Sequence, residues 1–84
     1  KNVKVDNLVH IAHGVIIHEN CMIIANSLIA GSTIIEKNSW VAPSASIMHN
    51  VVVGEESLIG MGAVVIKNVE KQSIVVGNPA KRIK

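Results

Sequence analysis

The sequence has almost no aromatic residues: Trp40 is the single aromatic among 84 residues, and there is no Phe or Tyr. A core built around aromatic rings is therefore excluded. Cys21 is the only cysteine, so no disulfide can form within the chain. No apolar run approaches the roughly 20 residues needed to cross a bilayer. These absences, with no signal-peptide pattern, predict a cytoplasmic protein without a membrane span.

Charge is also scarce. The formal net charge is +2, and the basic residues are scattered until the last four positions. This pattern argues against a basic surface that binds nucleic acid. A chain of 84 residues makes at most one domain, residues 1–84, and buries little apolar surface alone, so we expect an oligomer. The chain starts without Met and already in register with a repeat, so we also expect that an N-terminal part of the parent protein precedes it.

Ile and Val are abundant, at 26 of the 84 residues. Such β-branched side chains favour strands. They recur with a period of six, and a fixed short period is the signature of a solenoid. Every sixth residue from Val5 is Ile or Val, eleven times in eleven: Val5, Ile11, Ile17, Ile23, Ile29, Ile35, Val41, Ile47, Val53, Ile59 and Val65.

Two further positions of each hexad follow the same period. Four residues after each Ile or Val the side chain is small or β-branched, from Val9 to Val69, which suits a narrow interior. The position before that, from Gly14 to Asn68, is Gly or Asn in seven of ten cases, and these residues tolerate positive φ. Each hexad therefore predicts a short strand followed by a tight corner.

Three hexads close one triangular coil. The fold class predicted is all-β, a parallel β-helix with eleven uninterrupted hexads over residues 5–70, a little under four coils. Residues 71–84 form a capping segment: a last strand at 73–76 and a turn at 77–80 that ends the coil.

Residues three hexads apart stack on one edge of such a coil. One corner column contains His13, Gly31, His49 and Lys67, so the two histidines share an edge about 10 Å apart, with open space at Gly31. A neutral imidazole there can remove a proton from an acceptor amine or hydroxyl while the other binds that acceptor. The alternative is two solvated corner histidines.

Other columns predict contacts. His18 stacks under Glu36, which predicts a surface ion pair, and Cys21 points inward, where burial disfavours the nucleophilic thiolate. A contiguous apolar stripe rarely stays exposed, and a threefold axis can bury one, so we expect a homotrimer. The outward strand positions form two such stripes: Met22, Trp40 and Leu58; Ile16, Ile34 and Val52.

The whole pattern resembles the hexapeptide-repeat acyltransferase superfamily, over residues 5–81. That resemblance, and not the period, implies a left-handed coil, against the usual right-handed crossover rule. Residues 5–13, VDNLVHIAH, resemble the segment around the catalytic histidine of UDP-3-O-acylglucosamine N-acyltransferases. The resemblance implies that His13 is the general base and that His49 is a second catalytic histidine.

The C-terminal segments resemble other members. Residues 59–65, IGMGAVV, and 76–81, VGNPAK, are similar to acetyl-CoA-dependent sugar acetyltransferases of the sialic acid and bacillosamine type. This implies acetyl-CoA as donor, no metal, a sugar acceptor and active sites between subunits of the homotrimer. The residues implied to contact the cofactor are Gly60, Gly62, Ala63, Gly77, Asn78, Pro79, Lys81 and Arg82.

Two other functions remain open. The γ-class carbonic anhydrases use the same solenoid and bind zinc between subunits through three histidines. His13 and His18 have a matching spacing of five, although Gly54 stands five residues after His49. A non-catalytic trimeric solenoid is the other alternative.

Overall fold

The computed structural model describes residues 2–84, and every regular element in that range is a short β-strand. No helix that could cross a membrane occurs among these residues. The strands are β1 (Lys4–Val5), β2 (His10–Ile11), β3 (Ile16–Ile17), β4 (Met22–Ile23), β5 (Leu28–Ile29), β6 (Ile34–Ile35), β7 (Trp40–Val41), β8 (Ser46–Ile47), β9 (Val52–Val53), β10 (Leu58–Ile59), β11 (Val64–Val65), β12 (Ile74–Val76) and β13 (Lys81–Arg82).

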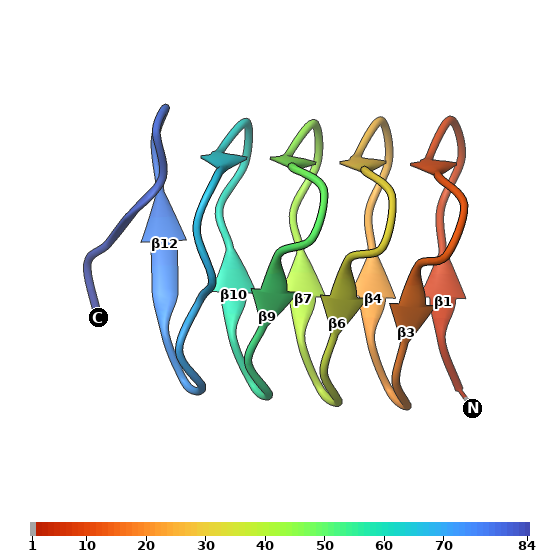
Figure 1. The fold of residues 1–84 in the computed structure, drawn as a ribbon, viewed down its shortest axis with the longest axis horizontal. Helices are drawn as coiled ribbons and strands as arrows, with labels where there is room; N and C mark the ends of the chain where they lie inside the picture. The colour runs from red at the N-terminus through yellow and green to blue at the C-terminus, as the bar shows by residue number, and fades with distance from the viewer. Residues whose placement is uncertain (1) are drawn as a thin grey trace.

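The strands form three sheets, one on each side of a triangular prism (Figure 1). Sheet A has the order β1-β4-β7-β10-β12-β13, sheet B the order β11-β8-β5-β2, and sheet C the order β3-β6-β9. From β1 to β11, neighbouring strands are parallel and three hexads apart, as in Lys4 opposite Met22. In Figure 1 the chain rises through sheet A behind, descends through sheet C in front and advances away from the N-terminus, so the coil is left-handed. The predicted fold is confirmed.

The inward positions form the core. The column that reads Ile or Val at every sixth residue is fully buried from Ile23 to Ile59, with 0% exposure at each residue. The second inward column is smaller, with Ser39, Ala45 and Ser57 among its buried members. Each hexad therefore points one β-branched and one small side chain into the interior. These side chains alone fill the narrow prism, and no aromatic ring is needed.

The corners have the backbone that the sequence predicted. Every sixth residue from Gly14 to Gly62 has positive φ, between 57° and 78°. Asn2 and Leu8, which precede the predicted series, have it too, at 58° and 60°. Gly and Asn carry this conformation with least strain, whereas Leu8 is an uncommon residue for it.

Small polar side chains inside the prism tie each coil to the next. Ser39 Oγ donates a hydrogen bond of 3.1 Å to the carbonyl of Gly54, and Thr33 Oγ1 donates one of 3.0 Å to Met48. Ser27 and Ser57 donate equivalent bonds to Ala42 and Glu70. Each buried hydroxyl thus satisfies a corner carbonyl of the following coil, which removes the cost of burying it.

The last coil differs from the prediction of uninterrupted hexads. Leu58 pairs with Ile74, two positions short of the three full hexads that separate the other paired strands, so two residues are missing from the repeat. Val69 consequently forms a β-bridge with Val53. It therefore lies in the column of Ile and Val residues that starts at Val5, and not in the column of small residues predicted for it. The correction has a sequence basis: the next strand position is Lys71, which cannot enter the apolar core, so the chain advances Val69 into that place.

The shortened coil changes two neighbouring residues. Asn68 does not have the predicted positive φ. Its side-chain Oδ1 instead accepts a hydrogen bond of 2.9 Å from the Val52 N–H. Gly54 is buried because residues 70–71 cross directly over it: a Cβ there would lie 2.5 Å from the Lys71 nitrogen and 2.8 Å from the Glu70 carbonyl carbon.

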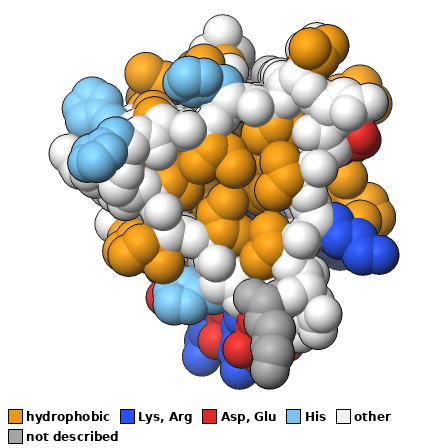
Figure 2. Space-filling model, turned by 90° about the vertical axis from the view of Figure 1, so that its right-hand side faces the viewer, with side chains coloured by type: hydrophobic (Ala, Val, Ile, Leu, Met, Phe, Trp, Pro, Cys, Tyr) orange, Lys and Arg blue, Asp and Glu red, His pale blue; other side chains and the backbone are white. Residues whose placement is uncertain are grey.

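The C-terminal segment closes one side of the prism. The predicted last strand and turn are confirmed as β12 and residues 77–80, the latter containing a cis Asn78–Pro79 peptide bond. The turn lies over β11, where Ala80 N donates to Val64 O at 2.8 Å. The chain then returns as β13, antiparallel to β12. At the opposite end, Figure 2 shows hydrophobic side chains filling the centre of the open first coil, where Val5 is 48% exposed.

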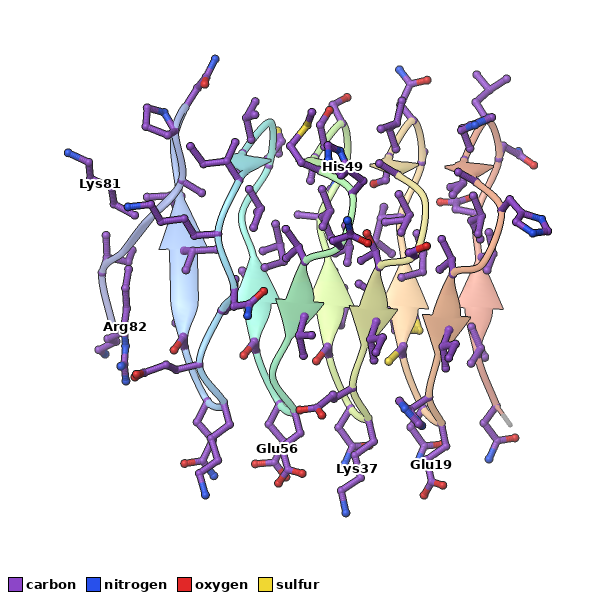
Figure 3. All side chains as sticks on the ribbon, viewed as in Figure 1. Glu19, Lys37, His49, Glu56, Lys81 and Arg82 are labelled. Carbon is purple, nitrogen blue, oxygen red and sulfur yellow. The ribbon has the colours of Figure 1, made fainter. Side chains whose placement is uncertain are left out.

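Charge gathers on one corner of the prism. Five of the six acidic residues lie at the corner between sheets C and A: Glu19, Glu36, Glu55, Glu56 and Glu70. Lys37 stacks between Glu19 and Glu55, through backbone bonds from Asn38 to Glu19 and from Glu56 to Lys37. Figure 3 shows this charged corner along one margin of the prism, with His49 on the other side.

The crossing of residues 70–71 over Gly54 predicts a position-specific loss of stability. Gly54→Ala places a methyl group against backbone atoms, so we expect a loss of about 2 kcal/mol or more. Gly31→Ala is the matched control, since its Cβ meets only the His13 carbonyl, at 3.3 Å. Urea unfolding of both variants measures the difference, and equal losses would contradict the shortened coil.

Candidate active site

The edge between sheets B and C carries the two predicted catalytic histidines. Ser32 N donates to His13 O at 3.1 Å, and Asn50 N donates to Gly31 O at 3.0 Å. These bonds stack three successive coils at one corner. His13, Gly31 and His49, called the histidine edge below, therefore share one edge as the sequence predicted.

Gly31 makes a notch in the histidine edge. Its φ is not positive, and a Cβ would meet one atom within 4 Å, the His13 carbonyl oxygen. Packing around most of that position is therefore open. Ala30 N and Ser32 N donate to Ile47 O and His13 O, whereas the Gly31 N–H enters no hydrogen bond among the described residues. The notch thus combines open space with an available backbone donor.

Both histidine side chains are exposed and face solvent. Within residues 2–84 neither imidazole takes part in a side-chain hydrogen bond or an ion pair. No carboxylate of the same chain therefore orients His13. The backbone hydrogen bonds that stack successive coils at this corner do not continue to Lys67. The shortened last coil displaces residues 66–68 from the position that such a bond requires.

The predicted ion pair between His18 and Glu36 is wrong. His18 N donates to Ile35 O, so the two residues do stack on the charged corner. The single ion pair recorded within residues 2–84, however, joins Arg82 and Glu70. His18 is exposed and Glu36 is half-buried, and an ion pair at such a surface position gains little over hydration.

The residues predicted to contact a cofactor gather at a different place. Gly60, Gly62 and Ala63 form the last corner between sheets A and B, and the 77–80 turn lies over β11 directly after it. Val64 N donates to Gly77 O at 2.9 Å, which holds the turn against this corner. The structure therefore brings Gly77, Asn78 and Pro79 together with the 60–63 corner.

Much of that corner is already occupied by the chain itself. The N–H groups of Gly60, Gly62 and Ala63 donate to Val75, Pro43 and Gly60 carbonyls. Gly60 is buried, and a Cβ there would lie 2.7 Å from Val76 Cγ1. Gly62 is exposed, has φ of 68° and has no atom within 4 Å of its Cβ position, so it offers the open surface of this corner.

Lys81 and Arg82 lie at the C-terminal end of the prism, beyond the last coil (Figure 3). Both are exposed. Arg82 Nη1 donates to Glu70 Oε1 at 2.8 Å. Sequence reasoning missed Glu70, although the break of the period at Lys71 marks the place where the coil departs from its repeat.

The histidine edge and the cofactor corner lie on opposite margins of sheet B. Sheet B is flanked by the corner of residues 60–63 on one side and by the corner of His13 and His49 on the other. One prism therefore cannot bring the two sets together. Two prisms packed side by side can place one set against the other.

No group of three His, Cys, Asp or Glu side chains within residues 2–84 is arranged to hold a metal ion. The zinc alternative needs imidazoles from two chains, so it is not tested by one chain. It stays a prediction.

Comparison with known proteins bears directly on the repeat. The profile of the bacterial transferase hexapeptide family (six repeats) matches residues 32–67. This segment is therefore similar to bacterial transferase hexapeptide repeats. The UDP-3-O-acylglucosamine N-acyltransferase of Caulobacter sp. (strain K31) is 34% identical over 84 residues, all of this chain and 25% of that protein. The predicted resemblance to hexapeptide-repeat acyltransferases is confirmed.

Two acetyltransferases extend the similarity. The chloramphenicol acetyltransferase of Agrobacterium fabrum (strain C58 / ATCC 33970) is 46% identical over 55 residues, 66% of this chain and 26% of that protein. The solved structure of a polySia specific acetyltransferase superposes with a TM-score of 0.70 at 26% identity, over 98% of this chain and 51% of that one. The chain thus spans about a quarter of the length of the curated relatives that it matches.

Cys21 is a chemically distinct group near the charged corner. Its side chain is 0% exposed, and Sγ donates to the Glu36 carbonyl at 3.1 Å. Burial raises the pKa of the Cys21 thiol, against the smaller lowering effect of backbone hydrogen bonds from Ser39 and Asn38. The thiol is therefore protonated and shielded at neutral pH.

We expect iodoacetamide to leave native Cys21 unmodified at pH 7 and to react with it in urea. Mass spectrometry of the intact chain measures the label, and the activity should be unchanged by the reagent under native conditions. Rapid labelling of the folded protein would contradict the inward position of Cys21.

Proposed function

We propose that the chain is the β-helix domain of an acetyltransferase, which moves an acetyl group from acetyl-CoA to an amine or hydroxyl of a nucleotide-linked sugar. The observation that carries the proposal is the histidine edge: two exposed imidazoles on one corner with the notch at Gly31 between them. The names of the matched relatives, acyltransferases and acetyltransferases, support the same reaction type.

The chemistry is direct transfer. The lone pair of the acceptor nitrogen or oxygen attacks the thioester carbonyl while the His13 imidazole takes the acceptor proton. A new bond from the acceptor to the acyl carbon forms, and the carbon–sulfur bond breaks. The thiolate of CoA leaves and takes its proton from the His13 imidazolium. No acyl-enzyme is required, which agrees with the shielded position of Cys21.

Gly31 has a defined part in this proposal. The carbonyl oxygen of the thioester gains negative charge in the transition state, and a fixed backbone donor stabilises that charge. The Gly31 N–H is available, next to His13 in the stack, and the missing side chain lets the thioester approach it. His49, one coil beyond the notch, binds the acceptor on the other side.

The site is completed by a second chain. The histidine edge and the cofactor corner lie on opposite margins of sheet B, so one chain supplies His13 and its neighbour supplies Gly62 and the 77–79 turn. A homotrimer repeats this contact three times and closes. Exposed apolar side chains support such packing: Ile16 is 51% exposed and Trp40 is 47% exposed. The charged corner then faces solvent.

The donor and acceptor follow from the same arrangement. Lys81 and Arg82 lie at the C-terminal end, where their charges suit the phosphates of CoA. The acceptor class rests on the sugar-acylating relatives, the N-acyltransferase and the polySia specific enzyme. A nucleotide-linked amino sugar supplies the amine from which the His13 imidazole takes a proton.

His13→Ala removes the general base, so we expect kcat to fall by about 10²- to 10⁴-fold. The measurement is thiol release from acetyl-CoA in the presence of amino-sugar nucleotides, with light scattering to show that the assembly is intact. The trimer mass should be unchanged, because the side chain is exposed and makes no side-chain hydrogen bond or ion pair within residues 2–84.

His18→Ala is the matched control. It removes another exposed imidazole, which lies at the charged corner and away from the histidine edge. Its kcat should equal that of the unaltered chain. Full activity of His13→Ala would remove this residue from the mechanism, and zinc bound stoichiometrically to the active protein would favour the lyase alternative.

A further inference from the structure

A pocket opens at the C-terminal end of the prism, where the last coil is shortened. Its volume is about 310 Å³. Val65, Val69 and Val75 form an apolar floor that continues the core, and Ala80 adds to one wall. Lys67, Asn68, Glu70 and Arg82 form a polar and charged rim.

The pocket exists because two residues are missing from the repeat. A full coil would lay another strand over the interior beyond Val65 and Val69. The chain instead crosses early to β12, and the returning tail covers sheet A and part of sheet B. The part of the prism end that stays uncovered, between the tail and the displaced residues 66–68, is the pocket. An apolar floor beside the two rim cations, Lys67 and Arg82, suits a flat ring that carries phosphate groups.

The Arg82 guanidinium is held at this rim by the chain itself. Nη1 donates to Glu70 Oε1 at 2.8 Å, and Nε donates to the Lys84 carbonyl at 3.0 Å. The ion pair is exposed, with 52% of the Arg82 side chain and 82% of the Glu70 side chain accessible. Exposed pairs of this kind contribute little stability, so a competing anion can replace the carboxylate at small cost.

We propose that Glu70 occupies the place of a donor phosphate: the nucleotide end of CoA enters this pocket, and its phosphate displaces the Glu70 carboxylate from Arg82. The inference rests on the proposed function, which supplies the donor. Glu70 is then a positioning residue that acts through Arg82. It holds the guanidinium at the rim in the free protein and lowers the affinity for the phosphorylated donor by competing with it.

The length of the donor is compatible with this position. With two prisms side by side and their axes parallel, the neighbour's pocket lies about two coil spacings beyond Gly31 along the axis, or about 10 Å. The arm between the thioester and the first phosphate of CoA has about a dozen bonds, which reach about 15 Å when extended on ordinary backbone dimensions. The thioester can therefore sit at the level of the notch while the phosphates reach the rim.

The test is calorimetric titration of the whole chain with two probes, CoA and pantetheine, which lacks the nucleotide and its phosphates. Glu70→Gln should tighten the Kd of CoA about two- to fivefold, the range expected for release of an exposed ion pair. The Kd of pantetheine should not move. In kinetics with acetyl-CoA, the KM should fall by the same factor with kcat unchanged.

A double-mutant cycle assigns the effect to Arg82. In the Arg82→Gln background, Glu70→Gln should change nothing, because the guanidinium that it releases is absent. Glu56→Gln is the matched control: it removes the same charge from a carboxylate that accepts a hydrogen bond of 3.1 Å from Gln72. The Kd of CoA should stay at the unaltered value in that variant.

An unchanged or weaker Kd in Glu70→Gln, or an equal tightening in Glu56→Gln, would overturn the exchange while leaving the acetyltransferase proposal in place. Failure of every variant to bind either probe would overturn both proposals.

Discussion

The structure depends on one constraint: every sixth side chain must be β-branched and must fit inside a triangle only three short strands around. When this condition holds, each coil presents its backbone in register to the next, with bonds such as Ile34 N to Val51 O at 3.0 Å. The hydroxyl of Ser39 then reaches a corner carbonyl of the following coil. Neither aromatic rings nor a second layer is needed, because each repeat covers its neighbour.

The same constraint decides where chemistry can occur. Side chains at inward positions form the core, and the backbone groups of the strands are hydrogen-bonded within the sheets. Functional groups are therefore confined to corners and outward faces. A corner returns once in every three hexads, and this spacing is what aligns His13, Gly31 and His49 although they are far apart in the sequence. Sheet B separates this edge from the corner of Gly62, so the arrangement favours sites shared between chains.

The sequence predicts most of this architecture because each hexad repeats the same local pattern, so the period can be read along the chain without knowledge of tertiary contacts. The core column, the positive φ at corners such as Asn38 and the histidine edge all followed from counting. The shortened last coil did not, because Val69 fits two columns equally well and only packing against Val53 decides between them. The pair of Arg82 with Glu70 was equally hidden, since it depends on how the tail folds back. Residues within the period are predictable, whereas those beyond its last regular coil are determined by tertiary contacts.

The most direct test of the central claim, that the histidine edge receives the thioester of acetyl-CoA, is calorimetric titration of Gly31→Val with acetyl-CoA. The branched side chain fills the notch, where its Cβ meets the His13 backbone carbonyl at 3.3 Å, and leaves both imidazoles chemically unaltered. Ala25→Val is the matched control, since Ala25 occupies the same position of its hexad on the preceding corner of the chain. The account predicts saturable binding to the unaltered chain and to Ala25→Val, and a loss of binding in a folded Gly31→Val protein. Binding of acetyl-CoA to Gly31→Val with unaltered affinity would contradict it.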